Sequence, residues 1–345
     1  MTLRLSVLDQ TPVGEHSSGD LALRSSVELA RALDPLGFTR YWTAEHHGSP
    51  GFAGTAPEIL ATALLGATER MRIGTGGVLL PRYPALKVAE VFGVLSALYP
   101  GRVDLGIGRA GGPAHQFPRQ LAELRDHLGL VEPFEPTVPR GVLPPRLWLL
   151  GAGTGSAELA GEAGSDFAFA HFLNPRTGRA AFETYRHGLA ARPAEVAALA
   201  GPALTRPAAG TARPTAALAV RVVTADTAAR AELLAQAMLL WRSRKDLGHD
   251  LPLPSAHTTR HHRWTGAETE RALANSAALV SGTPEQVHRQ LTALAAEHQV
   301  DELIVNTLTA DPADRLRSYE LLAEVFALDG APAPTPDAGP VLRAC

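Results

Sequence analysis

Strand-like and helix-like segments alternate along almost all of this 345-residue chain, and this alternation constrains the fold more than any other feature. Runs of strand character recur eight times: 3–9, 41–45, 72–80, 102–108, 146–151, 166–172, 217–224 and 302–306. Most are followed by a helix-like stretch: 24–36, 56–69, 84–98, 155–163, 176–191, 227–242, 284–297 and 312–326. Eight βα units predict a parallel sheet that closes into an α/β (β/α)8 TIM barrel over 1–328. An open doubly wound sheet is the alternative.

Several segments do not follow this alternation of strand and helix. Residues 109–145 follow the fourth strand as a proline-rich stretch with one predicted helix at 117–128, and 243–281 form an insertion before the eighth strand. Residues 193–215 are rich in Ala, Pro and Gly, which is typical of a surface connection. The tail 329–345 lacks the hydrophobicity needed to pack, so we expect it to be disordered. The insertion carries histidines that favour a solvated loop or a lid: His257, His261 and His262.

Composition excludes several classes of function. The formal net charge is −3, so the chain lacks the excess of basic residues that is typical of proteins that bind nucleic acid or an anionic membrane surface. The only cysteine is Cys345, which excludes an internal disulfide and any multi-cysteine metal site. No apolar run is long enough to cross a bilayer, and the N-terminus does not have the pattern of a signal peptide. We therefore expect a cytoplasmic protein.

Polar, glycine and histidine residues gather where the predicted strands end, which is the edge of a TIM barrel that carries chemistry. These residues are Asp9, Glu45, His46, His47, Gly76, Gly77, Gly108, Arg109, the segment 151–156, His171, Asn306 and Thr307. They include no cluster of cations for a polyanion. We therefore expect a small organic substrate that is apolar or aromatic.

The adjacent residues Glu45, His46 and His47 favour proton chemistry. A histidine exchanges protons near neutral pH, and a neighbouring carboxylate can orient it. Neighbouring residues of a strand point opposite ways, so one histidine could instead only fill space. Adjacent histidines rarely bind one ion together, and we expect no metal site. His171 is interpreted either as a residue of the substrate pocket or as a satisfied core histidine.

Two further features point to a bound anion. The segment LLGAGTGSAELAG (149–161) leaves the fifth strand and opens a helix, whose N-terminus can hold phosphate. A Rossmann site is disfavoured, because the next strand does not end in an acidic residue. Arg109 could hold phosphate bidentately, or it could form an ion pair with Asp104 or Glu45. The candidate ligands in the segment are Gly151, Gly153, Thr154, Gly155 and Ser156.

A glycine pair, Gly76-Gly77, interrupts a strand that would otherwise be rich in branched residues. Two glycines in a strand usually mark a bulge or a backbone that a ligand approaches closely. Both interpretations remain open from the sequence.

Six stretches together resemble the ordered signature of bacterial luciferase-like monooxygenases, nearest to the branch found in antibiotic biosynthetic clusters. They are AEHHGSPG (44–51), GTGGVLLP (74–81), LKVAEVF (86–92), ALYPGRVDLGIGRAGG (97–112), SGTPEQV (281–287) and DELIVNT (301–307). The resemblance implies a catalytic His46 near the oxygen-reactive edge of FMN, with Glu45 and His47 lining the site. It also implies a cis 76–77 peptide beneath the flavin and a phosphate held by Arg109. Relatives usually have serines where Ala152 and Gly153 stand.

The resemblance implies an FMN-dependent monooxygenase of secondary metabolism that uses O2 and reduced flavin from a separate flavin reductase. A deazaflavin-dependent hydride-transfer enzyme is the first alternative, because a sister branch uses that cofactor. A non-catalytic flavin-binding protein is the second, because of the two missing serines. The helix at 56–69 has apolar residues on more than one face, which favours a homodimer.

Overall fold

Eight parallel strands close on themselves into a barrel. The computed structural model describes residues 3–110, 112–131, 139, 142–191 and 214–328. The strands run in the order β1 (Arg4–Asp9), β2 (Arg40–Thr43), β3 (Arg72–Thr75), β5 (Val103–Gly108), β6 (Arg146–Gly151), β7 (Asp166–Ala170), β8 (Ala216–Thr224) and β10 (Glu302–Asn306). Strand β10 pairs with both β8 and β1, which closes the sheet. The predicted TIM barrel is confirmed, and the open sheet is excluded.

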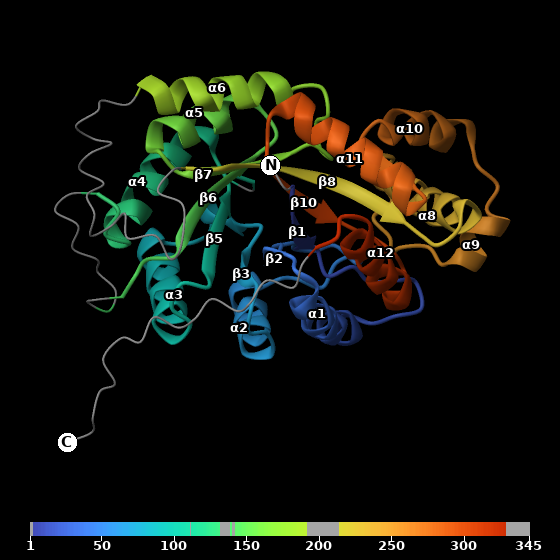
Figure 1. Ribbon diagram of the computed structural model, residues 1–345, viewed down its shortest axis with the longest axis horizontal. Helices are drawn as coiled ribbons and strands as arrows, with labels where there is room; N and C mark the ends of the chain where they lie inside the picture. Colours follow the sequence, from blue (N-terminus) through green and yellow to red (C-terminus); the bar gives the residue numbers. More distant parts are fainter. Residues whose placement is uncertain (1–2, 111, 132–138, 140–141, 192–213, 329–345) are drawn as a thin grey trace.

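Helices cover the outside of the barrel (Figure 1). They are α1 (Gly19–Leu33), α2 (Pro57–Ala67), α3 (Ala85–Leu98), α4 (Phe117–His127), α5 (Thr154–Ala163), α6 (Gly178–Ala191), α8 (Ala228–Asp246), α11 (Pro284–His298) and α12 (Pro312–Val325). Helix α1 turns an apolar stripe inward, since its buried residues recur mostly every three or four positions. None of these described helices combines the length and the hydropathy needed to span a bilayer.

The segment 243–281 is largely helical rather than loop-like. Helix α8 extends to Asp246, four residues beyond its predicted end, and is followed by α9 (Ala256–His261) and α10 (Gly266–Ser276). A short strand, β9 (Leu279–Gly282), then pairs with the end of β8. Figure 1 shows α9 and α10 outside α8, at one end of the molecule. The predicted disordered tail 329–345 and most of the connection 193–215 lie outside the described residues.

The predicted strand 72–80 divides in two. Strand β3 ends at Thr75, and a two-residue strand, β4 (Val78–Leu79), resumes after Gly76-Gly77 and pairs only with β5. A 3₁₀ turn (Leu80–Arg82) then leads into α3. The interruption lies at the end of the barrel where the active sites of this fold are found.

The barrel interior holds two kinds of layer. Its middle is apolar: Trp42 and Trp148 meet edge to face, with ring centroids 5.0 Å apart, among Leu8, Ile304 and small alanines. The layer below, where the strands begin, is ionic. Alternation along each strand places both layers on the same inward face, two residues apart.

Arg40 is the centre of the ionic layer. Its Nη1 lies 2.6 Å from Asp104 of β5, and its Nε lies 2.6 Å from Glu302 of β10. Arg72 of β3 also binds Asp104, at 2.6 Å. Burial alone would raise the pKa of Asp104, but Arg72 and Arg40 lower it to about 2. The pKa of Glu302 is lowered in the same way, chiefly by Arg40 acting against its burial.

We predict that Arg40→Met destabilises the protein by about 3–5 kcal/mol, because it leaves two buried carboxylates without their shared cation. Urea unfolding at pH 7 measures the loss. Arg31→Ala is the matched control: the Arg31–Glu28 pair is exposed and is worth about 0.5 kcal/mol or less.

The pH dependence of this loss provides a second check. Carboxylates with lowered pKa values stabilise the fold above their unfolded pKa of ~4 and lose this effect as the pH falls through the folded value. In Arg40→Met the two carboxylates lose one of their cations and take up protons more readily, so the loss of unfolding free energy should become smaller between pH 7 and pH 4. A deficit that stays below ~1 kcal/mol at pH 7 would show that Arg40 does not hold the strands together.

Candidate functional site

His46 lies at the mouth of the barrel. Arg40 and Trp42 point into the interior from β2, and the same alternation brings His46 to the inward side above them. Its backbone N–H donates to the carbonyl of Gly54 at 2.8 Å, and its ring stacks on Phe52 with centroids 4.3 Å apart. The sequence prediction that His46 belongs to the barrel mouth agrees with this placement.

Glu45 and His47 lie on the opposite side of the same segment. Glu45 is buried and accepts hydrogen bonds from the backbone N–H of Leu79 and from the Tyr83 hydroxyl, each at 2.8 Å. His47 lies 2.5 Å from the same carboxylate. The carboxylate is therefore used to hold the segment after β4. Glu45 and His47 thus bind each other, and none of the hydrogen bonds described for them involves His46. That they line the site with His46 stays a prediction.

Gln10 connects His46 to a buried arginine that the sequence analysis missed. The Gln10 side-chain nitrogen lies 3.1 Å from His46 Nε2, and its oxygen lies 3.5 Å from Arg221 Nη2. An arginine can only donate, so the Gln10 oxygen faces Arg221 and its NH2 group donates to His46. Nε2 of His46 then accepts, and the proton of the neutral ring sits on Nδ1. Nδ1 is buried and has no partner among the described residues.

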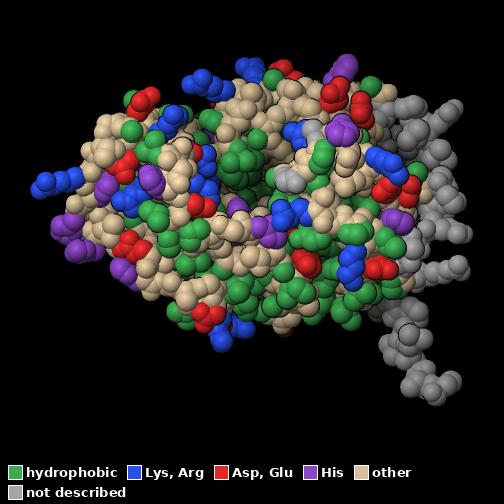
Figure 2. Space-filling view, turned by 180° about the vertical axis from the view of Figure 1, so that it is seen from behind, with side chains coloured by type: hydrophobic (Ala, Val, Ile, Leu, Met, Phe, Trp, Pro, Cys, Tyr) green, Lys and Arg blue, Asp and Glu red, His purple; other side chains and the backbone are tan. Residues whose placement is uncertain are grey.

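Charge around the mouth favours the neutral imidazole. Burial lowers the pKa of His46 most, and the cations Lys245 and Arg221 lower it further, to about 4. Burial likewise lowers the pKa of Arg221, to about 9, with a contribution from Arg242. His46 is therefore neutral near pH 7, with one unused N–H donor. Figure 2 shows a hollow on one face of the molecule, with hydrophobic side chains around it and cationic and histidine side chains at its edge.

The Gly76–Gly77 peptide bond is cis, as the resemblance implied. Packing requires both glycines: a Cβ at Gly76 would lie 2.7 Å from Leu8 Cδ1, and one at Gly77 would lie 2.5 Å from the Gly106 carbonyl oxygen. The pair leaves a wall of bare backbone beside the barrel mouth. The bulge interpretation accounts for the glycines by themselves, and a ligand that approaches this backbone is compatible with it.

Arg109 and the start of α5 lie side by side. Ile107 pairs with Leu149, so β5 leads into Arg109 next to the point where β6 ends at Gly151. Arg109 is exposed and forms no salt bridge with the described residues, because Asp104 pairs with Arg40 and Arg72, and Glu45 with His47. Among the described residues, the ion pair with Asp104 or Glu45 that the sequence allowed does not form.

Helix α5 begins at Thr154 with Gly153 as its N-cap, so no side chain caps its first N–H groups. The loop before it is fixed, because the Ala152 carbonyl accepts from Asn174 at 3.1 Å and from Thr177 at 3.3 Å. A Cβ at Gly151 would collide with Ser156, whereas Gly153 and Gly155 face open space. The predicted anion-binding residues are thus brought together: an exposed guanidinium beside an open helix N-terminus.

His171 does not lie with His46. It is buried against α11, where its ring meets that of His298 edge-on at a centroid distance of 5.9 Å. Phe167 and Phe169 of the same strand also face the surrounding helices. Burial, with His298 nearby, lowers its pKa. His171 therefore lies in the packed core, but its buried Nδ1 has no hydrogen-bond partner among the described residues, so it is not the satisfied core histidine that the sequence allowed. Its place in a substrate pocket stays a prediction.

The histidines of the insertion have local partners. His262 lies 3.0 Å from Glu268 and 3.3 Å from Arg244, and His261 lies on the exposed side of α9. Within the described ranges no group of three or more His, Cys, Asp or Glu could hold a metal ion. These residues tie α8, α9 and α10 together.

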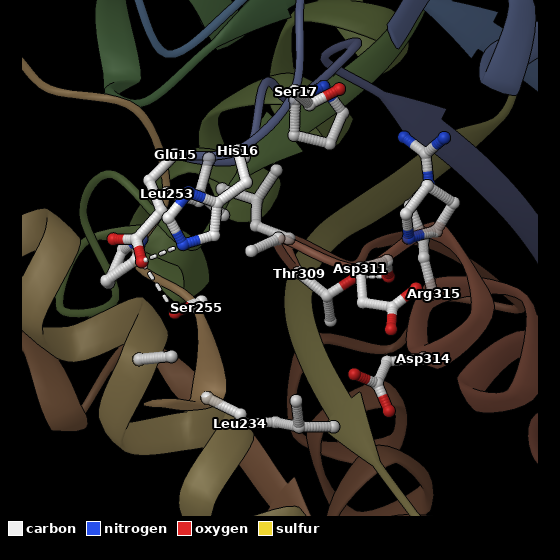
Figure 3. A pocket seen from close by; sticks show the side chains of 18 of the residues that line it. Glu15, His16, Ser17, Leu234, Leu253, Ser255, Thr309, Asp311, Asp314 and Arg315 are labelled. Atoms are coloured by element: carbon white, nitrogen blue, oxygen red, sulfur yellow. Dashed lines mark hydrogen bonds and ion pairs between the residues drawn. The ribbon is translucent and has the colours of Figure 1, made fainter. Parts of the chain in front are cut away.

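A cavity of about 620 Å³ lies beside the barrel mouth, between α8, α12 and the segments that follow β1 and β10 (Figure 3). Leu253 and Leu308, which line it, belong to the cluster that includes Phe52, the residue stacked on His46. Its charged side chains mostly bind each other: Glu15 contacts His16 and Ser255, and Arg230 binds Asp314 at 2.7 Å. We assign this cavity no function.

Comparison with known proteins identifies the family. The model of the luciferase-like monooxygenase family matches residues 1–302. A luciferase-like monooxygenase of Escherichia coli (strain K12) is 32% identical over 94% of this chain and 97% of its own length. The uncharacterized protein YwcH of Bacillus subtilis (strain 168) is 37% identical over 94% of this chain and 99% of its own.

Solved structures agree. Apo-MsnO8 superposes with a TM-score of 0.82 at 38% identity, covering 94% of this chain and 99% of its own. At 18% and 14% identity, two proteins share the fold alone: the oxygenating constituent of 3,6-diketocamphane monooxygenase in complex with FMN, from Pseudomonas putida, and an F420-dependent secondary alcohol dehydrogenase with an F420–acetone adduct. Their TM-scores are 0.65 and 0.64 over 94% of this chain, and 98% and 99% of their own. The chain belongs to the luciferase-like monooxygenase family and is a flavin-dependent monooxygenase.

Proposed function

We propose that this protein is a cytoplasmic FMN-dependent monooxygenase of secondary metabolism, which uses reduced FMN from a separate flavin reductase and O2 to oxygenate a small organic substrate. The observation that carries the proposal is the unpartnered Nδ1–H of His46, a buried donor at the mouth of a flavin-family barrel. A buried donor without a partner costs free energy, and a ligand atom at the barrel mouth would satisfy it. The place in secondary metabolism rests on the sequence resemblance.

The residues at the barrel mouth fit both the phosphate end and the ring end of FMN. Arg109 and the first N–H groups of α5 form a cradle for a phosphate on β5 and β6. His46 lies just after β2, and the bare Gly76–Gly77 backbone lies just after the neighbouring strand, β3. Reduced FMN, when bound, supplies the electrons that activate O2 for transfer of one oxygen atom.

The protein's own residues bind, orient and manage a proton. Gln10 holds the His46 ring in the tautomer that presents Nδ1–H, and this N–H can donate to a reacting oxygen atom. The aromatic residues Phe52 and Trp241 pack beside it and exclude water. Glu45 keeps the segment after β4 in place through Leu79 and Tyr83.

A deazaflavin-dependent hydride-transfer enzyme is the second candidate, because an F420-dependent dehydrogenase shares this fold. Titration of the purified protein with FMN and with F420 separately, followed by absorbance, distinguishes the two cofactors. Binding of FMN with release of hydrogen peroxide only, across a broad substrate panel, would favour a non-catalytic flavin-binding protein. That outcome would point to the missing serines at Ala152 and Gly153.

The protein also acts as a homodimer in this proposal. Large apolar side chains are exposed on two adjacent helices: Ile59 of α2 is 68% exposed, and Val94 and Leu98 of α3 are 50% and 64% exposed. A shallow groove between them is lined by Thr62, Val94 and Leu98. An apolar patch of this kind on a soluble protein often marks an interface.

Dimerisation through this patch predicts a mass of about twice the 36.4 kDa chain in light scattering at micromolar concentration. The double change Ile59→Glu and Leu98→Glu should give the monomer, because like charges would then meet across a twofold interface. Leu273→Glu, at an exposed leucine of α10, is the control and should remain dimeric. A wild-type protein of 36.4 kDa in solution contradicts the prediction.

Arg109→Ala should weaken FMN binding by at least about tenfold, since it removes a charge-assisted contact to phosphate worth ~1.5–3 kcal/mol. Fluorescence titration of FMN measures the change. Arg119→Ala, at an exposed arginine of α4, is the control. Gly153→Ser should tighten binding, because the open space there admits a hydroxyl donor. Unchanged FMN affinity in a folded Arg109→Ala protein would move the phosphate site elsewhere.

His46→Ala should fold and bind FMN as the wild type does, because the proposed phosphate cradle lies on other strands. Oxygen transfer should fall by about a hundredfold or more, with hydrogen peroxide released instead. Incorporation of ¹⁸O from ¹⁸O2 into the best acceptor of a substrate panel measures the loss. His46→Asn should recover part of the activity, because its amide can present a donor near the Nδ1 position.

Two further measurements separate this role from a structural one. His47→Ala should have a milder effect, because His47 faces away from the mouth. Since the pKa of His46 is about 4, the wild-type rate should show no loss assignable to its protonation between pH 6 and pH 8. Equal losses of melting temperature, FMN affinity and oxygen transfer in His46→Ala would mean that His46 is only a packing residue.

A further inference from the structure

Arg221 is buried at the barrel mouth without a counter-charge. It is only 5% exposed, yet it forms no salt bridge with any described carboxylate. Its Nε donates to Asn306 Oδ1 at 3.2 Å, and its Nη2 lies 3.5 Å from Gln10 Oε1. The nearest acceptor for Nη1 is the Met238 sulfur at 4.0 Å, which accepts hydrogen bonds weakly. Of its five N–H donors, one makes a bond of ordinary length.

The other buried arginines of the described chain are paired. Arg40 binds two carboxylates, and Arg315 binds Asp9 at 3.0 Å. A buried cation normally has such a partner, because removal of a charge from water is costly. Arg221 instead faces rings: its guanidinium carbon lies 4.9 Å from the Phe172 centroid and 6.0 Å from that of Trp241. An anion that is absent from the protein itself would complete this site.

The position of Arg221 relates it directly to His46. Arg221, Asn306, Gln10 and His46 come from four consecutive barrel strands, β8, β10, β1 and β2. Gln10 alone separates the guanidinium from the imidazole. The phosphate cradle at Arg109 and α5 belongs to β5 and β6, on the other side of the ring of strands.

We propose that Arg221 binds a carboxylate of the substrate, so that the protein oxygenates small carboxylic acids with an aromatic or aliphatic body. The inference rests on the proposed function and narrows its substrate class. The carboxylate would pair with Nη1 and Nη2, whose contacts within the chain are long, at 4.0 and 3.5 Å. The body of the molecule would lie beside Phe172, Trp241 and Phe52, the residues that surround Arg221 and His46. Arg221 is therefore a specificity-determining residue, and it also orients His46 through Gln10.

The test uses binding to the FMN-loaded and the FMN-free protein, so that it does not depend on turnover. Phenylacetate, benzoate and hexanoate are each compared with their primary amides by calorimetry and by melting temperature. The acids should bind and raise the melting temperature of the wild type, and the uncharged amides should bind at least about tenfold more weakly. Arg221→Met should abolish this preference, and Arg221→Lys should restore part of it. Arg119→Gln, at an exposed arginine of α4 paired with Glu123, is the control and should keep the preference.

Two outcomes overturn the proposal, and a form of the second gives Arg221 another role. Equal binding of acids and amides by the wild type means that no carboxylate site exists. Retained preference in Arg221→Met places the carboxylate elsewhere. An Arg221→Met protein that loses FMN affinity tenfold while its preference for acids persists assigns the guanidinium to the flavin. Failure of the wild type to bind FMN would refute the proposed cofactor, but carboxylate binding to the FMN-free protein would still report on Arg221.

Discussion

Arg40 joins parts of the chain that are far apart in sequence, and the barrel depends on this contact. Its guanidinium binds Glu302, at the start of the last strand, and Asp104, at the start of the fourth, and all three side chains are almost completely buried. Such a cluster is stable only when every charge is matched, so it rejects arrangements in which the strands are shifted in register. The two tryptophans above it fill the space that remains.

Buried charges are paired at the base of the barrel, whereas a buried charge is left unpaired at the mouth. At the base the arginines and carboxylates neutralise each other, and the pKa of Asp104 falls to about 2. At the mouth Arg221 meets only neutral acceptors, and the pKa values of both Arg221 and His46 are lowered by burial. The first arrangement serves stability. The second leaves the positive charge of Arg221 without a counter-charge next to the neutral His46, where it can bind an anion.

Much of the site could be read from local sequence. The histidine at the end of β2, the glycine pair after β3 and the glycine-rich segment before α5 are local signals, because strand ends and helix starts have their own residue preferences. Glu45 and His47 are adjacent to His46 in sequence, yet Glu45 binds His47 and the backbone of Leu79, contacts that adjacency in sequence does not reveal. His171 followed the same logic and turned out to face α11.

Arg221 and Gln10 could not be recognised from the sequence. Strand β8 has nine residues, and in the sequence Arg221 stands near the middle of the strand rather than at its end. The pairing of β8 with β10 ends at Arg221, and its further pairing with β9 begins there, so the residue lies at the barrel mouth. The sequence by itself determined the βα repeat and the residue types at the strand ends, because these depend on neighbours a few positions away. Only the tertiary structure decided which part of each strand lies inside the barrel and which buried side chain lacks a counter-charge. Both depend on lateral pairing between segments that are distant in the chain.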